Sequence, residues 1–409
     1  MVKEKISNTW NQRTMTYHIE TKILFLLLSI YTASLIIFDL SQNVIISNLF
    51  NILLFTVFGI FFLMNKNLKL QINNLIIMYF FFTAFSLGTI FWAVNFNLAF
   101  TYSMRLIVAV LNLFIIYTII SHYKIHNAIL YGATIGAFFN YLLAFNLIHV
   151  HYDLYEFGRF LGSQGNSNKL SRVMLIAIFS SLILLTYQST NKYLKIYLKF
   201  SILLSLYLIF LTVSKKAIIL APILLVSSLS FQRIKLKNII ITLIVFIILI
   251  KLFFTYADFT YLDHMRDILD KRFEGLFNLL EGKQGDASSG ERAYLLEEGF
   301  KIFLDNPIIG TGLNNFRVFL GKYAHNNYLE LLVDTGIIGM LLFYSIYIII
   351  LKKIKNMQKS KLRKYLLIMI LILLLMDLAT VTYYNKLILL VLLYIFYIAK
   401  NNQKENQYA

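Results

Sequence analysis

The sequence predicts an all-α polytopic membrane protein with about twelve transmembrane helices and a large, partly helical extracytoplasmic loop. Of its 409 residues, 59% are hydrophobic, which is more apolar side chain than a soluble fold can cover with polar surface. The apolar residues come in runs of about eighteen or more, the length that crosses about 30 Å of hydrocarbon. The chain has no cysteine, which excludes disulfides, thiolate metal sites and a cysteine nucleophile.

The apolar runs define the predicted spans in order along the chain. The segment 1–22 is polar and basic, and the run after it is long enough to remain as a spanning helix, so we expect no cleavable signal peptide. We predict twelve spans, at 23–39, 44–64, 72–93, 98–121, 127–149, 170–187, 196–213, 217–231, 238–254, 327–351, 365–382 and 386–399.

The lysines and arginines predict the orientation of these spans. If the N-terminus is cytoplasmic, the inner segment 352–364 alone carries seven of them. The short outer loops together carry only five, which are Arg159, Lys169, Lys215, Lys216 and Lys386. This positive-inside bias predicts a plasma-membrane protein with both termini in the cytoplasm. The net charge of +18 therefore reflects the membrane topology, and the lipid bilayer is the expected partner of these basic residues. Nucleic-acid binding is excluded.

One long outer segment divides the chain into three parts. We predict a bundle of nine spans at 1–254, a large extracellular loop at 255–326, and three further spans with a cytoplasmic tail at 327–409. Apolar residues at helical spacing predict an amphipathic helix over 262–280 in the loop. A second loop helix is expected over 291–304, before Asn306 and Pro307.

Several ionisable residues fall within or at the edge of the predicted spans. Such groups are costly in a bilayer and are functional candidates for that reason. Their shared depth indicates a polar cavity open to the outside, and separate structural salt bridges or hydrogen bonds are the alternative. These residues are Arg105, Arg172, Glu330, Asp334 and Asp377.

Two further features mark the outer face. Lys215 and Lys216 form a basic pair in a short outer turn, which suits an anionic headgroup such as pyrophosphate or simple snorkelling to the interface. His325 opens the tenth span, and on a continuous helix it would share one stripe with Leu332, Gly336 and Gly339. The glycines would let another helix approach and hold the imidazole at the membrane boundary. Glu330 and Asp334 would lie on the opposite face, too far round to orient His325.

The residues from His325 to Gly339 read H-N-x9-G-x2-G. This resembles the motif H-[N/S/Q]-x9-G-x2-[G/T/Y] of the O-antigen ligase and Wzy-type polysaccharide polymerase family, in which it closes the large outer loop. Four further segments resemble that family over roughly 159–340. They are the Gly/Asn-rich entry at 162–168, the turn at 214–217, the helix start at 289–292 and the P-x-x-G-x-G turn that contains Gly310 and Gly312.

The resemblance implies a metal-independent, GT-C-like glycosyltransferase without a cofactor. It would transfer a glycan from undecaprenyl pyrophosphate to a glycan acceptor, and a flippase and a chain-length regulator are candidate protein partners. We expect His325 to act as the base or to orient the acceptor, and Arg292 to stabilise the departing pyrophosphate. Substrate-binding candidates are Lys215, Lys216, Arg159, Asn326 and Asp377. At 215 and 216, lysine stands where the family usually has arginine, which replaces a bidentate guanidinium by a point charge.

The motifs leave three readings of the function open. Abundant Lys, Asn and Ile indicate an AT-rich genome, which favours a capsule or exopolysaccharide polymerase over a ligase that transfers finished glycan. A lipid-linked glycan flippase or other transporter is a further alternative, although no repeated halves are evident and alternating access needs no folded outer loop. A binding module for wall polymer is the third reading.

Overall fold

The computed structural model describes residues 2–38, 44–156, 158–188, 191–229 and 287–404. The predicted ninth span at 238–254 and the predicted amphipathic helix at 262–280 lie outside the described residues. Within them, α-helices dominate and the only sheet is one short hairpin. The elements are α1 (Val2–Ile37), α2 (Val44–Met64), α3 (Asn74–Gly88), η2 (Thr89–Phe91), α4 (Phe96–Tyr123), α5 (Asn127–Ala144), β1 (Tyr155–Glu156), β2 (Arg159–Phe160), η3 (Gly162–Gln164), α6 (Ser167–Tyr187), α7 (Lys192–Leu211), α8 (Lys215–Leu229), α11 (Ala287–Asp305), α12 (Phe316–Leu320), α13 (Asn327–Lys355), α14 (Lys361–Met376) and α15 (Lys386–Lys404).

Eight of the described helices are long and apolar enough to cross a membrane. They coincide with the predicted spans one to seven and ten. The predicted spans eight, eleven and twelve correspond to α8 and α14, which have 15 and 16 residues, and to α15, which carries lysines near both ends. The all-helical, multi-pass membrane class is therefore confirmed, and the count of twelve stays a prediction.

The predicted eleventh span, 365–382, extends beyond the helix that the structure contains. The helix α14 ends at Met376, and Asp377 is its C-cap residue. The backbone after it turns through bends and a short turn before α15 begins at Lys386. The apolar run did not reveal this end, because residues 378–383 remain mostly apolar although they are not helical.

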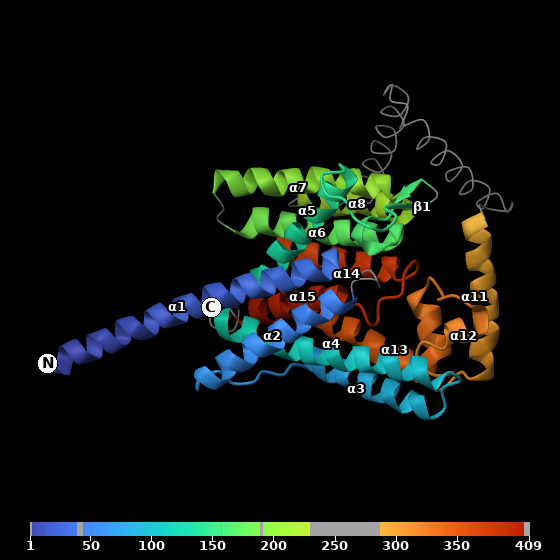
Figure 1. The fold of residues 1–409 in the computed structure, drawn as a ribbon, viewed down its shortest axis with the longest axis horizontal. Helices are drawn as coiled ribbons and strands as arrows, with labels where there is room; N and C mark the ends of the chain where they lie inside the picture. Colours follow the sequence, from blue (N-terminus) through green and yellow to red (C-terminus); the bar gives the residue numbers. More distant parts are fainter. Residues whose placement is uncertain (1, 39–43, 157, 189–190, 230–286, 405–409) are drawn as a thin grey trace, which may run out of the picture.

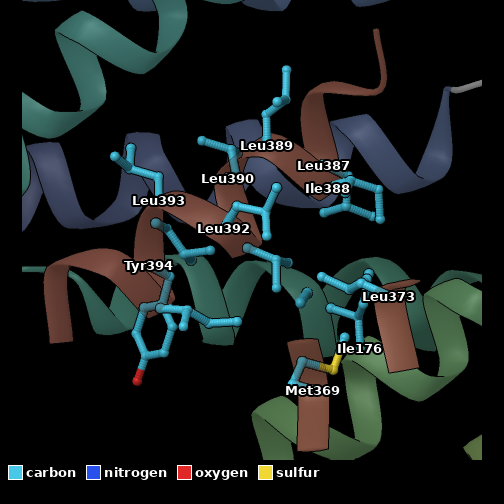
Figure 2. Packing of buried hydrophobic residues seen from close by; sticks show 14 of the residues in the cluster. Ile176, Met369, Leu373, Leu387, Ile388, Leu389, Leu390, Leu392, Leu393 and Tyr394 are labelled. Atoms are coloured by element: carbon cyan, nitrogen blue, oxygen red, sulfur yellow. The ribbon is translucent and has the colours of Figure 1, made fainter. Parts of the chain in front are cut away.

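The core surrounds α15, in which every residue from Leu387 to Ala399 is buried. A helix that is apolar on all sides must be enclosed by other helices. Figure 2 shows α15 side chains together with Ile176 of α6 and with Met369 and Leu373 of α14. Because α15 also packs against α1, α4, α5 and α13, the C-terminal helices and the N-terminal helices form one bundle.

The predicted site residues collect at one end of this bundle. The hairpin β1–β2 and the helices α11 and α12 lie at the end opposite to the start of α1 (Figure 1). The charge distribution predicts that this end faces outside. Helices α6, α8, α13 and α15 all begin there if the predicted orientation of their spans is followed.

Candidate active site

Helix α13 is broken at Gly336, which has φ 64° and ψ −169° and so lies in a region of backbone conformation that only glycine adopts readily. Beyond the break, the amide of Ile337 donates to the carbonyl of Pro307 at 2.9 Å, and that of Ile338 donates to Ile308 at 3.3 Å. The carbonyls of the loop before α13 thus accept the hydrogen bonds that carbonyls one turn earlier in the helix would otherwise accept. A Cβ at Gly336 would collide with the backbone of Ile308.

The break also leaves two backbone carbonyls of α13 without a partner in the helix, and these carbonyls accept hydrogen bonds from the same loop. Val333 accepts the amide of Thr311, and the carbonyl of Asp334 accepts the amide of Gly312, both at 2.9 Å. Gly310 has φ 71°, and a Cβ on it would meet the Asp334 backbone. The glycines Gly310 and Gly336 therefore allow a loop and a helix to exchange backbone hydrogen bonds at close approach.

This geometry corrects two expectations about the His325 motif. A continuous helix was expected to place His325, Leu332, Gly336 and Gly339 on one stripe, but the helix starts at Asn327 and is interrupted at Gly336. A second helix was expected to pack on the glycines. At Gly336 the close neighbour is instead the loop backbone at Ile308, and at Gly339 it is the helix's own Thr335 side chain.

The two acidic residues of α13 hold the segment that leads to His325. The carboxylate of Asp334 accepts the amides of Asn314 and Phe316, each at 2.7 Å. Glu330 accepts the amide of Ala324 at 2.8 Å. Both carboxylates are buried. In the described structure, neither carboxylate touches the imidazole. Glu330 nevertheless fixes Ala324, the residue just before His325. The expectation that Glu330 lies on the opposite helix face from His325 did not predict this role.

His325 lies before the helix, in a left-handed backbone conformation with φ 53°. Its half-buried ring stacks at 4.0 Å, centroid to centroid, on the ring of Tyr323. Burial and the charge of Arg292 lower the pKa of His325 to about 4, with a smaller contribution from Lys322. Glu291 opposes this shift and forms an ion pair with Lys322. The imidazole is therefore neutral at pH 7 and can accept a proton.

Arg292 also lowers the pKa of Lys216. It lies in the second turn of α11, and Lys216 lies in the first turn of α8, just before the predicted span. Burial and Arg292 together lower the pKa of Lys216 to about 8. Because Arg292 acts on both Lys216 and His325, these three residues, which are distant in sequence, lie near one another in the fold.

The remaining motif segments converge on the same region. Arg159 in β2 donates from Nε to the carbonyl of Thr212 at 3.0 Å, which anchors the hairpin to the turn before Lys215. Ser214 of that turn donates to the side chain of Asn168 at 3.0 Å. Asn166, which caps α6, donates to the Tyr323 hydroxyl at 3.3 Å. The Gly/Asn-rich segment 162–168 therefore joins the turn at 214–217, which we call the lysine turn, to the segment that carries His325.

Two predicted substrate-binding residues make hydrogen bonds within the protein. Asn326 caps α13, because its side chain accepts the amides of Tyr328 and Leu329. Asp377 is 1% exposed and accepts hydrogen bonds from the hydroxyls of Thr382 and Tyr344, at 2.7 and 3.0 Å. These contacts give no support to a substrate contact for either side chain.

The polar cavity predicted from five ionisable span residues is found only in part: a cavity of about 470 Å³ beside this site has Arg105 in its lining, but not Arg172, Glu330, Asp334 or Asp377. Four cationic side chains line it, together with three tyrosines. Two of the cations, Lys169 and Lys386, are among the five basic residues that the predicted topology places in short outer loops. Their position there was the sequence signal that could have pointed to this cavity. The cationic and tyrosine residues of this wall, which we call the outer cavity, are Arg105, Lys169, Arg317, Lys386, Tyr102, Tyr323 and Tyr384.

The fold and the site together define a multi-pass membrane protein with a neutral histidine near half-buried cations at one end of the bundle. The O-antigen ligase family model matches residues 200–344, and this segment contains Lys215, Lys216, Arg292, His325 and both glycine motifs. The resemblance to the O-antigen ligase and Wzy-type family is thereby confirmed. No curated protein matches the chain. The match indicates a function related to these ligases and polymerases, and it supports an enzyme that acts on a lipid-linked glycan.

Proposed function

We propose that the protein is a polysaccharide polymerase that joins undecaprenyl-pyrophosphate-linked repeat units on the outer face of the plasma membrane. The observation that carries the proposal is the placement of His325, stacked on Tyr323, near Arg292, whose charge acts on both His325 and Lys216. Transfer from a lipid pyrophosphate needs a proton acceptor for the attacking hydroxyl and positive charge for the leaving group. These three side chains would supply both.

In the proposed reaction, an acceptor sugar hydroxyl attacks the anomeric carbon of the donor glycan. A new carbon–oxygen bond forms as the bond between that carbon and the pyrophosphate oxygen breaks. The hydroxyl proton passes to the imidazole of His325, and the electron pair of the broken bond remains on undecaprenyl pyrophosphate. Arg292 and Lys216 would stabilise this developing negative charge.

The charges of the site would make His325 a stronger base when the donor is bound. Positive neighbours favour the neutral form of an imidazole, and a bound anion favours its protonated form. A pyrophosphate at Arg292 and Lys216 would offset their charge and raise the pKa of His325 from about 4. Since a general base works best with a pKa near the operating pH, donor binding would prepare the base for the transfer step.

The test is the polysaccharide profile of cells in which the native copy carries His325→Ala. We expect long polymer to disappear while single lipid-linked repeat units accumulate on the outer leaflet. His151→Ala is the matched control, because His151 lies in the outer loop before the hairpin and is exposed. Its profile should equal that of the wild type, and membrane levels of both variants are checked by immunoblot.

Other outcomes would replace the proposal. Finished polymer that stays on its lipid carrier would identify a ligase. Repeat units that accumulate on the inner leaflet would identify a transporter. An unchanged profile at a normal protein level would remove His325 from the reaction.

A further inference from the structure

The ring of Tyr323 lies against the imidazole of His325. The two ring centroids are 4.0 Å apart, and the ring planes are inclined by 37°. Both side chains are half-buried, and both belong to the short segment between α12 and α13. The imidazole therefore packs against an aromatic ring that comes from its own segment, two residues earlier in the chain.

The backbone around His325 is fixed, but this alone does not fix the plane of its ring. Glu330 accepts the amide of Ala324 at 2.8 Å, and Asn326 caps α13. His325 itself keeps a φ of 53°, a conformation that a residue other than glycine adopts where its surroundings impose it. Rotation about χ2 of histidine has broad minima, so the ring could still turn. Within the described part of the chain, the ring of Tyr323 is the contact that limits this rotation.

Tyr323 is in turn held at its hydroxyl. Nδ2 of Asn166 donates to this hydroxyl at 3.3 Å. The other end of the same side-chain amide caps α6, because its Oδ1 accepts the backbone amides of Asn168 and Lys169. Since the oxygen is committed to the helix, the NH2 group is the end that faces Tyr323. The tyrosine ring is thus held both by the imidazole and by Asn166.

The loop that holds Tyr323 also holds the lysine turn. Ser214 of that turn donates to Oδ1 of Asn168 at 3.0 Å. The segment 166–168 therefore contacts Tyr323 on one side and the turn that carries Lys216 on the other. A displacement of the Tyr323 ring would change the position of the imidazole relative to the cations proposed for the leaving group.

An aromatic ring suits the proposed chemistry better than a carboxylate in the same place. A carboxylate beside an imidazole favours the protonated form, which cannot accept a further proton. The Tyr323 ring adds no charge, because burial raises the pKa of its hydroxyl to about 12. It can therefore orient the imidazole and still leave it neutral until the donor binds.

We propose that Tyr323 is a positioning residue, which holds the imidazole of His325 in the orientation that accepts the proton, and that Asn166 holds Tyr323 in place. This inference rests on the proposed function, because it assigns Tyr323 a part in the proton transfer to His325. A displacement of about 1 Å in a reacting group can slow a reaction about 100-fold, so loss of the ring contact should have a large effect on the rate.

The first experiment detects the ring contact and does not depend on transfer. Full-length protein with isotope-labelled histidine is studied by NMR in detergent micelles, and the His325 signal is assigned by its loss in His325→Ala. An aromatic ring at 4.0 Å shifts the signals of the imidazole protons. We expect this shift to persist in Tyr323→Phe and to disappear in Tyr323→Leu. Tyr193→Leu, at a tyrosine of α7 that is 81% exposed, is the matched control and should keep the wild-type signal.

The second experiment measures transfer by the same purified proteins, with their unfolding temperatures. Tyr323→Leu should lower kcat at least about tenfold and leave the donor KM unchanged, because the donor pyrophosphate is proposed to lie at Arg292 and Lys216. Tyr323→Phe keeps the ring and loses one hydrogen bond, so it should lower kcat only about threefold. The control Tyr193→Leu should keep the wild-type rate.

A double-mutant cycle tests the role of Asn166 without removing the ring. Asn166→Ser keeps a side-chain oxygen that can cap α6 but has no NH2 group to donate. We expect Asn166→Ser and Tyr323→Phe each to lower kcat about threefold, and the double variant to lower it no further, because both changes remove the same hydrogen bond. Effects that multiply in the double variant would show that Asn166 does not act through Tyr323.

Three results would overturn the role of Tyr323. A His325 signal that is identical in the wild type and in Tyr323→Leu would show that the rings are not in contact. A wild-type rate in Tyr323→Leu would show that the contact does not serve transfer. Equal losses in Tyr323→Leu and Tyr323→Phe would assign the effect to the hydroxyl and not to the ring. If the wild type transfers no glycan but its His325 signal depends on Tyr323, the proposed function fails while the hold of Tyr323 on the imidazole stands.

Discussion

In the segment that joins α12 to the break in α13, the buried carboxylates of Glu330 and Asp334 accept three backbone amides between them. At the same end of the bundle, Arg292 helps to lower the pKa of Lys216 to about 8, and four further cationic side chains line the outer cavity. The first region satisfies its charges within the protein and thereby fixes the backbone. In the second, the charge of Arg292 disfavours the charge on Lys216, and an anion bound there would relieve this repulsion. The scaffold therefore differs from the site in that its charged groups are hydrogen-bonded within the protein.

The largest expected effect is on the scaffold, at Gly336. Alanine there requires a backbone conformation with φ 64° and a Cβ in collision with the Ile308 backbone. We expect Gly336→Ala to destabilise the fold by about 3 kcal/mol or more, so that little folded protein reaches the membrane. Thermal unfolding of the detergent-solubilised protein measures this.

The matched control is Gly59→Ala in α2. A Cβ at Gly59 meets nothing within 4 Å, and alanine is favoured in a helix. Its unfolding temperature should equal or slightly exceed that of the wild type. A Gly336→Ala protein as stable as Gly59→Ala would contradict the hydrogen-bond exchange between the loop and α13.

The next effect concerns the site and should leave stability unchanged. Arg292→Gln removes one of the cations proposed for the leaving pyrophosphate, and loss of such a group typically lowers kcat by about 100-fold. The unfolding temperature should not fall, because removing the charge of the half-buried Arg292 relieves its repulsion of Lys216. Transfer rates of the purified protein and its melting curve test both statements. Lys301→Gln on the same helix is the control and should keep the wild-type rate.

The sequence singled out residues that the structure brings together, but it did not reveal the scaffold that holds them. His325, Arg292, Arg159 and the lysine turn were singled out by charge and motif, and the structure brings them to one end of the bundle. Apolar runs identified eight spans because length and composition decide whether a helix crosses a membrane. The break at Gly336 was missed because a glycine within a helical pattern does not reveal which backbone approaches it.

Two further features depend on the tertiary structure. The outer cavity is formed by the ends of helices that are more than 200 residues apart in sequence, such as those that carry Arg105 and Lys386, and the polar cavity predicted from the sequence included only Arg105 of its four cations. The substrate contact expected of Asp377, whose charge lies in an apolar run, stays a prediction. Its partners Thr382 and Tyr344 are brought to it by the turn after α14 and by α13, which only the tertiary structure shows.

Asp334→Asn tests the scaffold more gently than Gly336→Ala. The amide that replaces the carboxylate would present an NH2 group to the backbone N–H of Asn314 or Phe316, and one buried amide would lose its acceptor. We expect a loss of about 1–3 kcal/mol of stability. Asp153→Asn in an exposed loop should have no effect on the unfolding temperature. Equal stability of the two variants would show that the Asp334 contacts do not hold the segment.

The smallest expected effect is a change in pH dependence. The lowered pKa of Lys216, about 8, means that its charge is present below pH 8 and is lost as the pH rises through that value. We expect kcat/KM of the wild type to fall above about pH 8, because this ratio reports ionisations of the free enzyme. It should also fall below about pH 4, where His325 gains a proton. In Lys216→Arg the upper limit should move to higher pH, because arginine stays protonated. An upper limit that does not move would assign it to another group.

The most direct test of the central claim is reconstituted transfer. Purified wild-type protein and His325→Ala, matched in unfolding temperature, are placed in liposomes with lipid-pyrophosphate-linked repeat units, and polymer growth and released undecaprenyl pyrophosphate are measured together. We predict that the wild type forms both products in step and that His325→Ala forms them at least about 100-fold more slowly. Equal rates for the two proteins, or polymer growth without release of undecaprenyl pyrophosphate, would contradict the assignment of His325 as the base in transfer from a lipid pyrophosphate.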